Sequence, residues 1–328
     1  MIQSLHRIQQ PGAHFSACSF PPALAKSCKE FDRISRRRHS RADHARNLRL
    51  LIMPFDPKIR GPLDVRPLLQ LMSAGSWQVE LAHERDCHLV IWITRGQGRV
   101  LLDGQCRGFG PHTALCIPAR TLFSLELGRQ CIGQVLRIGE DIPCGLPETP
   151  MQIRINDMQE QGRINALFDA ALREQQVADD HTAKAITSYA DLVGIHLQRL
   201  WVRAPENRKP TAARRLCRAY CARLAQDAEG AFNMAGHASE LGVTPTHLTR
   251  VCKQETGKTA AALLTERQLH AARSLLASTR LPMRDIAQSL GFGSAAYFTR
   301  FITQHTGSTP SDLRKKAHGA QLASGRNP

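Results

Sequence analysis

The sequence LTRVCKQETGKT at residues 248–259 recurs in similar form fifty residues later, as FTRFITQHTGST at residues 298–309. The copies share Thr249/Thr299, Arg250/Arg300, Gln254/Gln304, Thr256/Thr306, Gly257/Gly307 and Thr259/Thr309. Upstream the match continues with an offset of 49, because Gly242 corresponds to Gly291, so the second copy carries one extra residue after that glycine. An insertion is tolerated where the chain turns, and each copy therefore predicts a helix, a turn and a second helix. Two copies indicate a duplicated module, since a solenoid needs about three stacked units.

The first copy contains the local signals of a helix-turn-helix. Gly242 ends a short amphipathic helix predicted over residues 233–241, at a position that requires a positive φ. Thr244 can cap the next helix, with Pro245 at its first position. That second helix presents Thr246, Thr249, Arg250 and Lys253 on one side and Leu248, Val251 and Cys252 on the other. The second helix of this motif lies in the major groove of DNA. The DNA-binding candidates are therefore Thr246, Thr249, Arg250 and Lys253.

The second copy repeats these signals, with Gly291-Phe292 at the turn and a helix that starts near Ser294. Its exposed side is predicted to carry the DNA-binding candidates Ser294, Ala295, Ala296, Thr299 and Arg300. Between the copies, LLTERQLHAARSLLAS at residues 263–278 predicts one rigid connecting helix. Arginine donates two hydrogen bonds to O6 and N7 of guanine, so Arg250 and Arg300 are the candidates for base recognition. The alternative is a duplicated helical bundle without a ligand.

Net charge separates the end of the chain from its middle. Residues 203–328 hold 19 Lys and Arg against 8 Asp and Glu, a net +11, whereas residues 53–202 hold 15 against 17, a net −2. A basic segment that also carries two helix-turn-helix signals favours a nucleic-acid partner for that segment alone. No apolar run approaches the roughly 18 residues of a membrane span, so no membrane partner is expected.

Residues 1–52 are also basic, with 10 Lys and Arg against 3 Asp and Glu, and include the run RISRRRHSRADHAR at residues 33–46. They lack apolar periodicity. We interpret them as a disordered arm, or as an upstream extension of a protein that naturally starts at Met53, and an arm that touches DNA is the alternative. The ten cysteines are scattered without a CxxC pair, which indicates reduced thiols in the cytoplasm, with a thiol redox sensor as the alternative.

The middle of the chain predicts strands followed by helices. HLVIWIT at residues 88–94 is rich in β-branched and aromatic residues, and Asp103-Gly104 is a turn signal. Short strands at this spacing over residues 65–140 predict a β-barrel or jelly roll. Residues 157–201 predict helices, and residues 203–212 predict a linker. Within the helices an apolar stripe along residues 185–201 fits either the core or a dimer seam, and it consists of Ile186, Tyr189, Leu192, Val193, Ile195, Leu197 and Leu200.

Residues 213–316 resemble the DNA-binding domain of the AraC/XylS family of bacterial transcription regulators. The resemblance is carried mainly by LPMRDIAQSLGFGSAAYFTRFITQHTGSTPSDLRK at residues 281–315. The residues that match the family pattern are Ile286, Ala287, Gly291, Phe292, Phe298, Arg300, Phe301, Gly307, Thr309, Pro310 and Arg314. The chain departs from that pattern at Cys252, where an aromatic residue is usual, and at the small residues Thr246, Ala295 and Ala296. These departures bear on the operator sequence and not on the fold.

The resemblance implies an α+β multidomain protein. Its N-terminal part would be a cupin-like β-barrel or jelly roll with trailing helices, which forms an effector and dimerisation domain over residues 53–202. An all-α double helix-turn-helix domain over residues 213–316 and a tail over residues 317–328 would follow. The implied function is sequence-specific transcription regulation in the cytoplasm. The implied partners are an operator in double-stranded DNA, a small-molecule effector, a second copy of the chain bound through helix 185–201, and RNA polymerase.

Metal-dependent cupin enzymes resemble one another in supplying a His-x-His pair, a Glu and a later His, and this set is incomplete here. His83 and His88 are five residues apart, no Glu lies between His88 and Gly96, and Phe123 stands where the late His is expected. We therefore expect no enzyme activity, no metal and no cofactor. His88 and Trp92 share one strand face and are effector-binding candidates if that face lines the barrel. The alternatives are a cupin metalloenzyme fused to a DNA-binding domain, and a cysteine-based alkylation or redox sensor.

Overall fold

The computed structural model describes residues 63–203, 211–227 and 233–324. All described residues belong to one compact unit. The expectations for residues 1–52 and for most of the linker at 203–212 lie outside the described ranges. None of the described helices combines the length and the apolar character that a membrane crossing requires.

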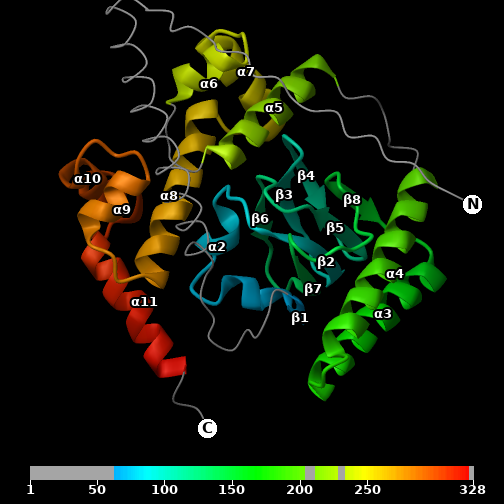
Figure 1. The fold of residues 1–328 in the computed structure, drawn as a ribbon. Coiled ribbons are helices and arrows are strands. Elements are labelled where there is room, and N and C mark those ends of the chain that lie inside the picture. The colour runs from blue at the N-terminus through cyan, green and yellow to red at the C-terminus, as the bar shows by residue number, and fades with distance from the viewer. Residues whose placement is uncertain (1–62, 204–210, 228–232, 325–328) are drawn as a thin grey trace, which may run out of the picture. The chain divides into compact units, whose positions relative to one another are not determined.

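The first part of the described chain forms two antiparallel sheets (Figure 1). The larger sheet has the strand order β1-β7-β2-β5-β8, and the smaller sheet has the order β4-β3-β6. The strands are β1 (Leu63–Pro67), β2 (Cys87–Arg95), β3 (Gly98–Leu102), β4 (Gln105–Phe109), β5 (Thr113–Ile117), β6 (Ser124–Leu127), β7 (Ile132–Gly139) and β8 (Met151–Arg154). The predicted short strands are confirmed. Their pairing leaves two separate sheets, so the described strands do not close into one hydrogen-bonded barrel.

Strand β2 is apolar on both faces because each face is covered. Leu89, Ile91 and Ile93 belong to a core that includes residues of the smaller sheet. Val90 and Trp92 point to the opposite side and belong to a second core, which includes residues of two long helices. All five side chains are at most 1% exposed. A strand buried on both faces reads as a continuous apolar run, which explains the stretch HLVIWIT.

The turn Asp103-Gly104 joins β3 and β4 as a two-residue hairpin, with Leu102 opposite Gln105. Both turn residues have positive φ, 56° and 67°, which is the geometry of the type I′ turn that Asp-Gly favours. The turn predicted at this position is thus confirmed. The Asp103 carboxylate also accepts hydrogen bonds from Arg214 and Arg218 of α5 (Ala212–Gln226), so the hairpin contacts the helical part of the chain.

Two long helices, α3 (Met158–Val177) and α4 (Thr182–Arg203), lie side by side on the larger sheet (Figure 1). The Trp92 indole N–H donates to the side-chain oxygen of Asn165 on α3 at 2.6 Å, which satisfies a polar group in this core. The apolar stripe of α4 is divided between two roles. Its residues Ile186, Val193 and Leu197 are buried in the core, whereas Leu192 and Ile195 are 44% and 40% exposed.

The remaining described elements are helical. The helix η1 (Leu68–Met72) and α2 (Trp77–Glu80) lie between β1 and β2. After α5 the chain forms α6 (Met234–Glu240), α7 (Pro245–Thr256), α8 (Ala260–Ser278), α9 (Met283–Ser289), α10 (Ala295–Thr306) and α11 (Pro310–Ser324). The predicted end of the last domain at residue 316 falls inside α11, which continues to Ser324. The described chain is therefore a mixed α+β structure with sheets first and a helical helix-turn-helix part last.

Candidate nucleic-acid interface

The two copies of the repeat fold into two helix-turn-helix modules with matching caps. We call α6 and α7 the first module and α9 and α10 the second. The Thr244 hydroxyl accepts the backbone N–H of His247 at 3.2 Å, and the Ser294 hydroxyl accepts that of Tyr297 at 3.1 Å. Each hydroxyl satisfies one of the N–H groups left unpaired at the start of a helix. The predicted starts of both second helices are confirmed.

The turns between the helices also correspond. Gly242 and Gly291 have φ values of 66° and 75°, in the left-handed region where glycine carries no steric cost. The next residue closes each turn on an alanine of the preceding helix. The Val243 N–H donates to the Ala238 carbonyl at 3.0 Å, and the Phe292 N–H donates to the Ala287 carbonyl at 2.9 Å. The two modules therefore share one backbone geometry.

The corresponding segments ETGKT (residues 255–259) and HTGST (residues 305–309) each contain the end of one helix and the cap of the next. Gly257 and Gly307 end α7 and α10 with φ values of 77° and 67°. Before each glycine, a threonine hydroxyl donates back to the helix: Thr256 to the Cys252 carbonyl at 2.7 Å, and Thr306 to the Ile302 carbonyl at 2.8 Å. After each glycine, the hydroxyls of Thr259 and Thr309 cap α8 and α11. The repetition in the sequence is thus a repetition of helix boundaries.

The outer side of each second helix carries the side chains predicted to bind DNA. Thr246, Arg250 and Lys253 of α7 are exposed and Thr249 is half-buried. In the second module Ser294, the cap of α10, and Ala296, Thr299 and Arg300 are exposed, and Ala295 is half-buried. The Thr299 hydroxyl donates to the Ala295 carbonyl at 2.9 Å. The structure thus brings the candidates of each module together on one helical face.

The opposite side of each second helix is packed into a core of its own. Leu248 and Cys252 of α7 are fully buried with residues of α5, α6 and α8. Phe298 and Ile302 of α10 are fully buried with residues of α8 and α9. Residues three and four apart face one way along a helix, so the burial of this side leaves the arginine side free for a ligand.

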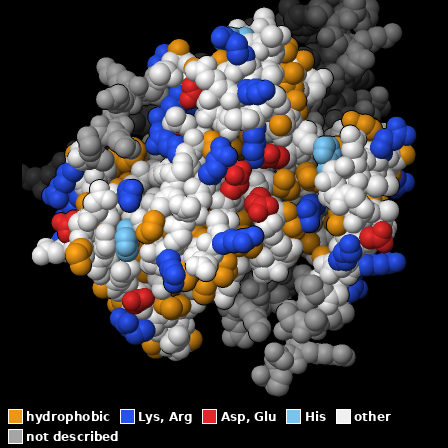
Figure 2. Space-filling view, turned by 180° about the vertical axis from the view of Figure 1, so that it is seen from behind, with side chains coloured by type: hydrophobic (Ala, Val, Ile, Leu, Met, Phe, Trp, Pro, Cys, Tyr) orange, Lys and Arg blue, Asp and Glu red, His pale blue; other side chains and the backbone are white. Residues whose placement is uncertain are grey.

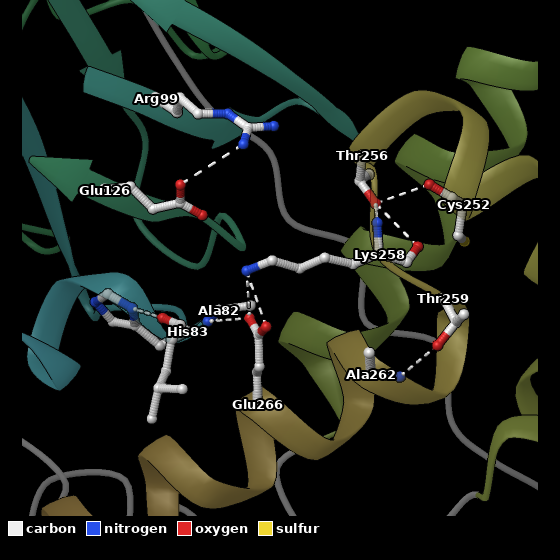
Figure 3. A network of polar contacts seen from close by, with 11 residues as sticks. Ala82, His83, Arg99, Glu126, Cys252, Thr256, Lys258, Thr259, Ala262 and Glu266 are labelled. Carbon is white, nitrogen blue, oxygen red and sulfur yellow. Dashed lines mark hydrogen bonds and ion pairs between the residues drawn. The ribbon is translucent and has the colours of Figure 1, made fainter. Parts of the chain in front are cut away.

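Helix α8 connects the modules, with α6 and α7 near one end and α9 and α10 toward the other (Figure 1). A chain of polar contacts fixes its first turns against α7 (Figure 3). The Lys258 backbone N–H donates to the Thr256 hydroxyl at 3.1 Å, and the Lys258 ammonium pairs with Glu266 at 2.8 Å. Glu266 also accepts the Ala82 backbone N–H at 3.1 Å. These contacts resist rotation of the first module about the end of α8.

Two exposed rings at the same position of the modules are not among the residues that the sequence predicted to bind DNA. His247 and Tyr297 each stand three residues before the candidate arginine, and Tyr297 is 58% exposed. The His247 imidazole Nδ1 lies 3.2 Å from a guanidinium nitrogen of Arg250. The offset of fifty residues that identified the arginines could have identified these rings as well.

Basic side chains are spread over the face drawn in Figure 2, among hydrophobic and neutral ones. The second helices and the connecting helix carry basic side chains that are exposed or half-buried, namely Arg250, Lys253, Arg273 and Arg300. Side chains of this charge contact phosphate groups, which makes binding to DNA dependent on salt. The net charge of +11 counted over residues 203–328 thus coincides with the part of the chain that holds both modules.

The two effector-binding candidates lie in different surroundings. Trp92 is fully buried and packs toward α3 and α4, on the side of β2 that faces away from the smaller sheet. His88 is half-buried, and its Nδ1 accepts the Ala119 backbone N–H at 3.4 Å. Burial lowers the pKa of His88, while Glu140 raises it. Ligand binding by this pair stays a prediction, and the face that carries Trp92 is filled by helices and does not line a space between the sheets.

His83 and the described cysteines lie apart from any grouping that could hold a metal ion within the described ranges. The side chain of His83 uses both ring nitrogens, Nδ1 near the Leu81 carbonyl at 2.8 Å and Nε2 accepting from Arg85 at 3.1 Å. Within the described ranges, no three His, Cys, Asp or Glu residues are grouped so that they could hold a metal ion. The described cysteines are free thiols, and three of them, Cys217, Cys221 and Cys252, are buried together between α5 and α7.

A stacked pair of histidines, His83 and His270, makes the stability of the protein sensitive to acid. Their ring centroids are 4.0 Å apart. Burial lowers the pKa of both rings, and His270, which also faces Arg85, Arg267 and Arg273, reaches a pKa of about 3. The folded pKa lies below the ordinary value of about 6.5. The neutral rings therefore contribute their full stabilisation of the folded state above about pH 6.5. This contribution is lost as the pH falls toward 3.

We expect the free energy of unfolding to fall by up to about 1.4 kcal/mol per pH unit for each histidine below about pH 6.5. Urea unfolding at several pH values between 7.5 and 4.5 measures this slope. His270→Asn should make the slope shallower, and His181→Asn, at an exposed position, should leave it unchanged. An unchanged slope in the His270 variant would mean that this ring does not contribute.

A comparison with protein-family models finds a match in the C-terminal part of the chain. Residues 237–316 match a family described as a helix-turn-helix domain. The arabinose operon regulatory protein of Salmonella typhimurium is 28% identical over 87 residues, which cover 26% of this chain and 31% of that protein. The HTH-type transcriptional activator RhaR of Escherichia coli O1:K1 is 30% identical over 105 residues, which cover 32% of this chain and 37% of RhaR. The chain thus spans less than two fifths of the length of these curated relatives.

Among solved structures, apo ToxT K231A from Vibrio cholerae aligns with 78% of this chain and 94% of its own, at 11% identity and a TM-score of 0.38. That score is too low to establish a common fold over the whole chain. The match to the helix-turn-helix family falls on the two modules whose geometry is described above. The segment at residues 237–316, which holds most of both modules, is thus a helix-turn-helix domain of the type found in AraC/XylS-family transcription regulators.

Proposed function

We propose that one subunit reads two short blocks of double-stranded DNA about one helical turn apart. The carrying observation is the equivalence of the modules, which places Arg250 and Arg300 at the same position of two identically capped helices. The connecting helix α8 has 19 residues and is therefore about 28 Å long. Successive major grooves on one face of B-DNA lie about 34 Å apart. A rigid α8 with a module near each end is consistent with α7 and α10 in adjacent grooves.

Within each groove the side chains would contact different chemical groups of the DNA. Arg250 and Arg300 are the candidates for guanine, whose O6 and N7 both accept from one guanidinium. Thr246, Thr249, Ser294 and Thr299 would contact base edges or phosphates, and Ala295 and Ala296 would contact thymine methyl groups. Because these two alanines offer no hydrogen bond, the second block should tolerate more base changes than the first. Lys253 would contact a phosphate group.

The test is a base-by-base binding scan on an operator selected from random duplex DNA. Arg250→Ala and Arg300→Ala should each cost about 1–3 kcal/mol of binding free energy and relax base preference in one block only. Lys253→Ala is the matched control, since loss of a phosphate contact should weaken all sequences alike and lower the salt slope by about one. If Arg300→Ala leaves both affinity and preference unchanged, the second module is a scaffold and the two-block proposal fails.

The part of the chain before the modules would form a regulatory domain. We assign residues 53–202 to a cupin-like effector and dimerisation domain, residues 203–212 to a linker and residues 213–316 to the DNA-binding domain. The effector would be a small molecule, with His88 and Trp92 as its candidate contacts. A ligand that binds the folded state raises the melting temperature by mass action, and screening small molecules for this shift with the whole chain tests the assignment. A ligand shift that persists unchanged in His88→Ala would remove His88 from the candidates.

The exposed side of α4 would be the dimer seam. Leu192, Ile195 and Val202 lie three and seven residues apart and are 44%, 40% and 80% exposed, which forms an apolar stripe beside the buried one. Leu192→Glu combined with Ile195→Glu should shift the chain from dimer to monomer in sedimentation equilibrium. Thr187→Glu, at a partly exposed polar site of the same helix, is the control. A wild-type chain that sediments as a monomer at high concentration would exclude this seam.

A transcription regulator acts in the cytoplasm of a bacterium and on the transcribing enzyme, so RNA polymerase is proposed as a further partner. Transcription in vitro from a selected operator, with and without the protein, would show activation, repression or neither.

A further inference from the structure

The side chain of His247 contacts the arginine that the proposed function assigns to base recognition. His247 is the third residue of α7, and its backbone N–H is held by the Thr244 hydroxyl at 3.2 Å. Its Nδ1 lies 3.2 Å from a guanidinium nitrogen of Arg250, one turn further along the helix. Both side chains are exposed on the face that carries the DNA-binding candidates.

The chemistry of the two groups determines the direction of this hydrogen bond. A guanidinium is always charged and only donates. The His247 Nδ1 must therefore accept, which requires a neutral ring with its proton on Nε2. The His247 Nδ1 thus accepts from one guanidinium nitrogen of Arg250, and the other N–H groups of the guanidinium stay available for a ligand.

We propose that His247 is a positioning residue, which orients the Arg250 guanidinium before DNA arrives. The inference rests on the proposed function, since it needs Arg250 to contact a base. An arginine on a free surface loses rotamer freedom when it binds, and that loss opposes binding. A hydrogen bond already made in the free protein removes part of the loss, and a planar fork held in place also discriminates better between bases.

The second module supplies an internal comparison. Tyr297 occupies the position of His247, and its backbone N–H is held in the same way by Ser294 at 3.1 Å. Its ring centroid lies 5.8 Å from that of Phe292. In the described part of the chain, no side chain makes a hydrogen bond to Arg300 that corresponds to the one from His247 to Arg250. One arginine is therefore oriented in advance and the other is free, so the modules should differ in base discrimination.

The experiment uses the whole chain and DNA selected from random duplexes. The base position whose preference is lost in Arg250→Ala is identified first. At that position His247→Phe, which keeps a ring but has no acceptor, should lower the preference about 2- to 10-fold. His247→Gln should retain it within about twofold, because the amide oxygen is an acceptor that can reach the same guanidinium. Tyr297→Phe is the matched control and should leave this position unchanged.

A double variant separates positioning from direct contact. In the Arg250→Ala background, His247→Phe should have no further effect, because the group that it orients is gone. An equal effect of His247→Phe in both backgrounds would show that His247 contacts the DNA itself and would overturn the proposal. Equal losses in His247→Gln and His247→Phe, or no loss in either, would also overturn it. If Arg250→Ala and Arg300→Ala both bind like the wild type, the proposed function itself fails, which is a distinct result.

Discussion

Phe298→Ala should destabilise the second module by about 3–5 kcal/mol. Phe298 is fully buried beneath α10, in a core with Ile302 and next to Phe292, whose ring centroid is 5.3 Å away. Truncation removes the transfer free energy of the ring and leaves a cavity that the surrounding helices fill only in part. Because α10 is held on the domain by this core, base preference in the second block should disappear with the fold of the module.

Thermal unfolding and hydrogen exchange of the whole chain measure this effect. Amides of α9 and α10 should lose protection, while those of the larger sheet should keep theirs. Leu248→Ala is the matched change in the first module, since Leu248 occupies the corresponding position and is also fully buried. It should cost about 2–5 kcal/mol and affect the first block instead. Equal loss of protection in both modules from either variant would mean that they unfold as one unit.

Glu84→Gln should cost about 3–5 kcal/mol, because it leaves a buried charge without its counter-charge. Arg267 of α8 is 4% exposed and donates to the two carboxylate oxygens of Glu84 at 2.7 and 3.2 Å. An amide can accept from the guanidinium but cannot neutralise it. Urea unfolding of the variant and the wild type at one pH measures the difference.

The double variant Glu84→Leu with Arg267→Met removes both charges. It tests whether the loss of stability in Glu84→Gln comes from the missing ion pair or from the unpaired charge of Arg267. Replacing both members of a buried ion pair with apolar residues is often neutral or stabilising, so the double variant should recover most of the loss. Glu126→Gln is the control, because its pair with Arg99 is long, at 3.9 Å, and exposed. A wild-type-like stability of Glu84→Gln would show that Arg267 finds water or another acceptor.

Features that depend on neighbours in the sequence could be predicted from the sequence. The caps Thr244 and Ser294, the glycines at 242 and 291, the connecting helix α8 and the Asp103-Gly104 hairpin all involve residues within about four positions of one another. Their hydrogen bonds and φ values are set by local backbone geometry, which is why short patterns were sufficient for them.

Features that depend on distant segments required the tertiary structure. Alternation showed that Trp92 and Val90 share one face of β2, but only the packing of α3 decided that this face is covered by helices. Periodicity likewise marked α4 as apolar without dividing its stripe into a buried and an exposed part. The pairing of Glu84 with Arg267 joins residues 183 positions apart.

The candidate site shows the same division. The repeat by itself determined which residues form the second helices of the two modules and that Arg250 and Arg300 are equivalent, because a helix places residues three and four apart on one face. The tertiary structure decided which of those faces is free, since that depends on what the rest of the chain covers. It also decided that the Nδ1 of His247 lies within hydrogen-bond distance of Arg250. Such a contact depends on the side-chain rotamers in the folded protein, which residue spacing does not determine.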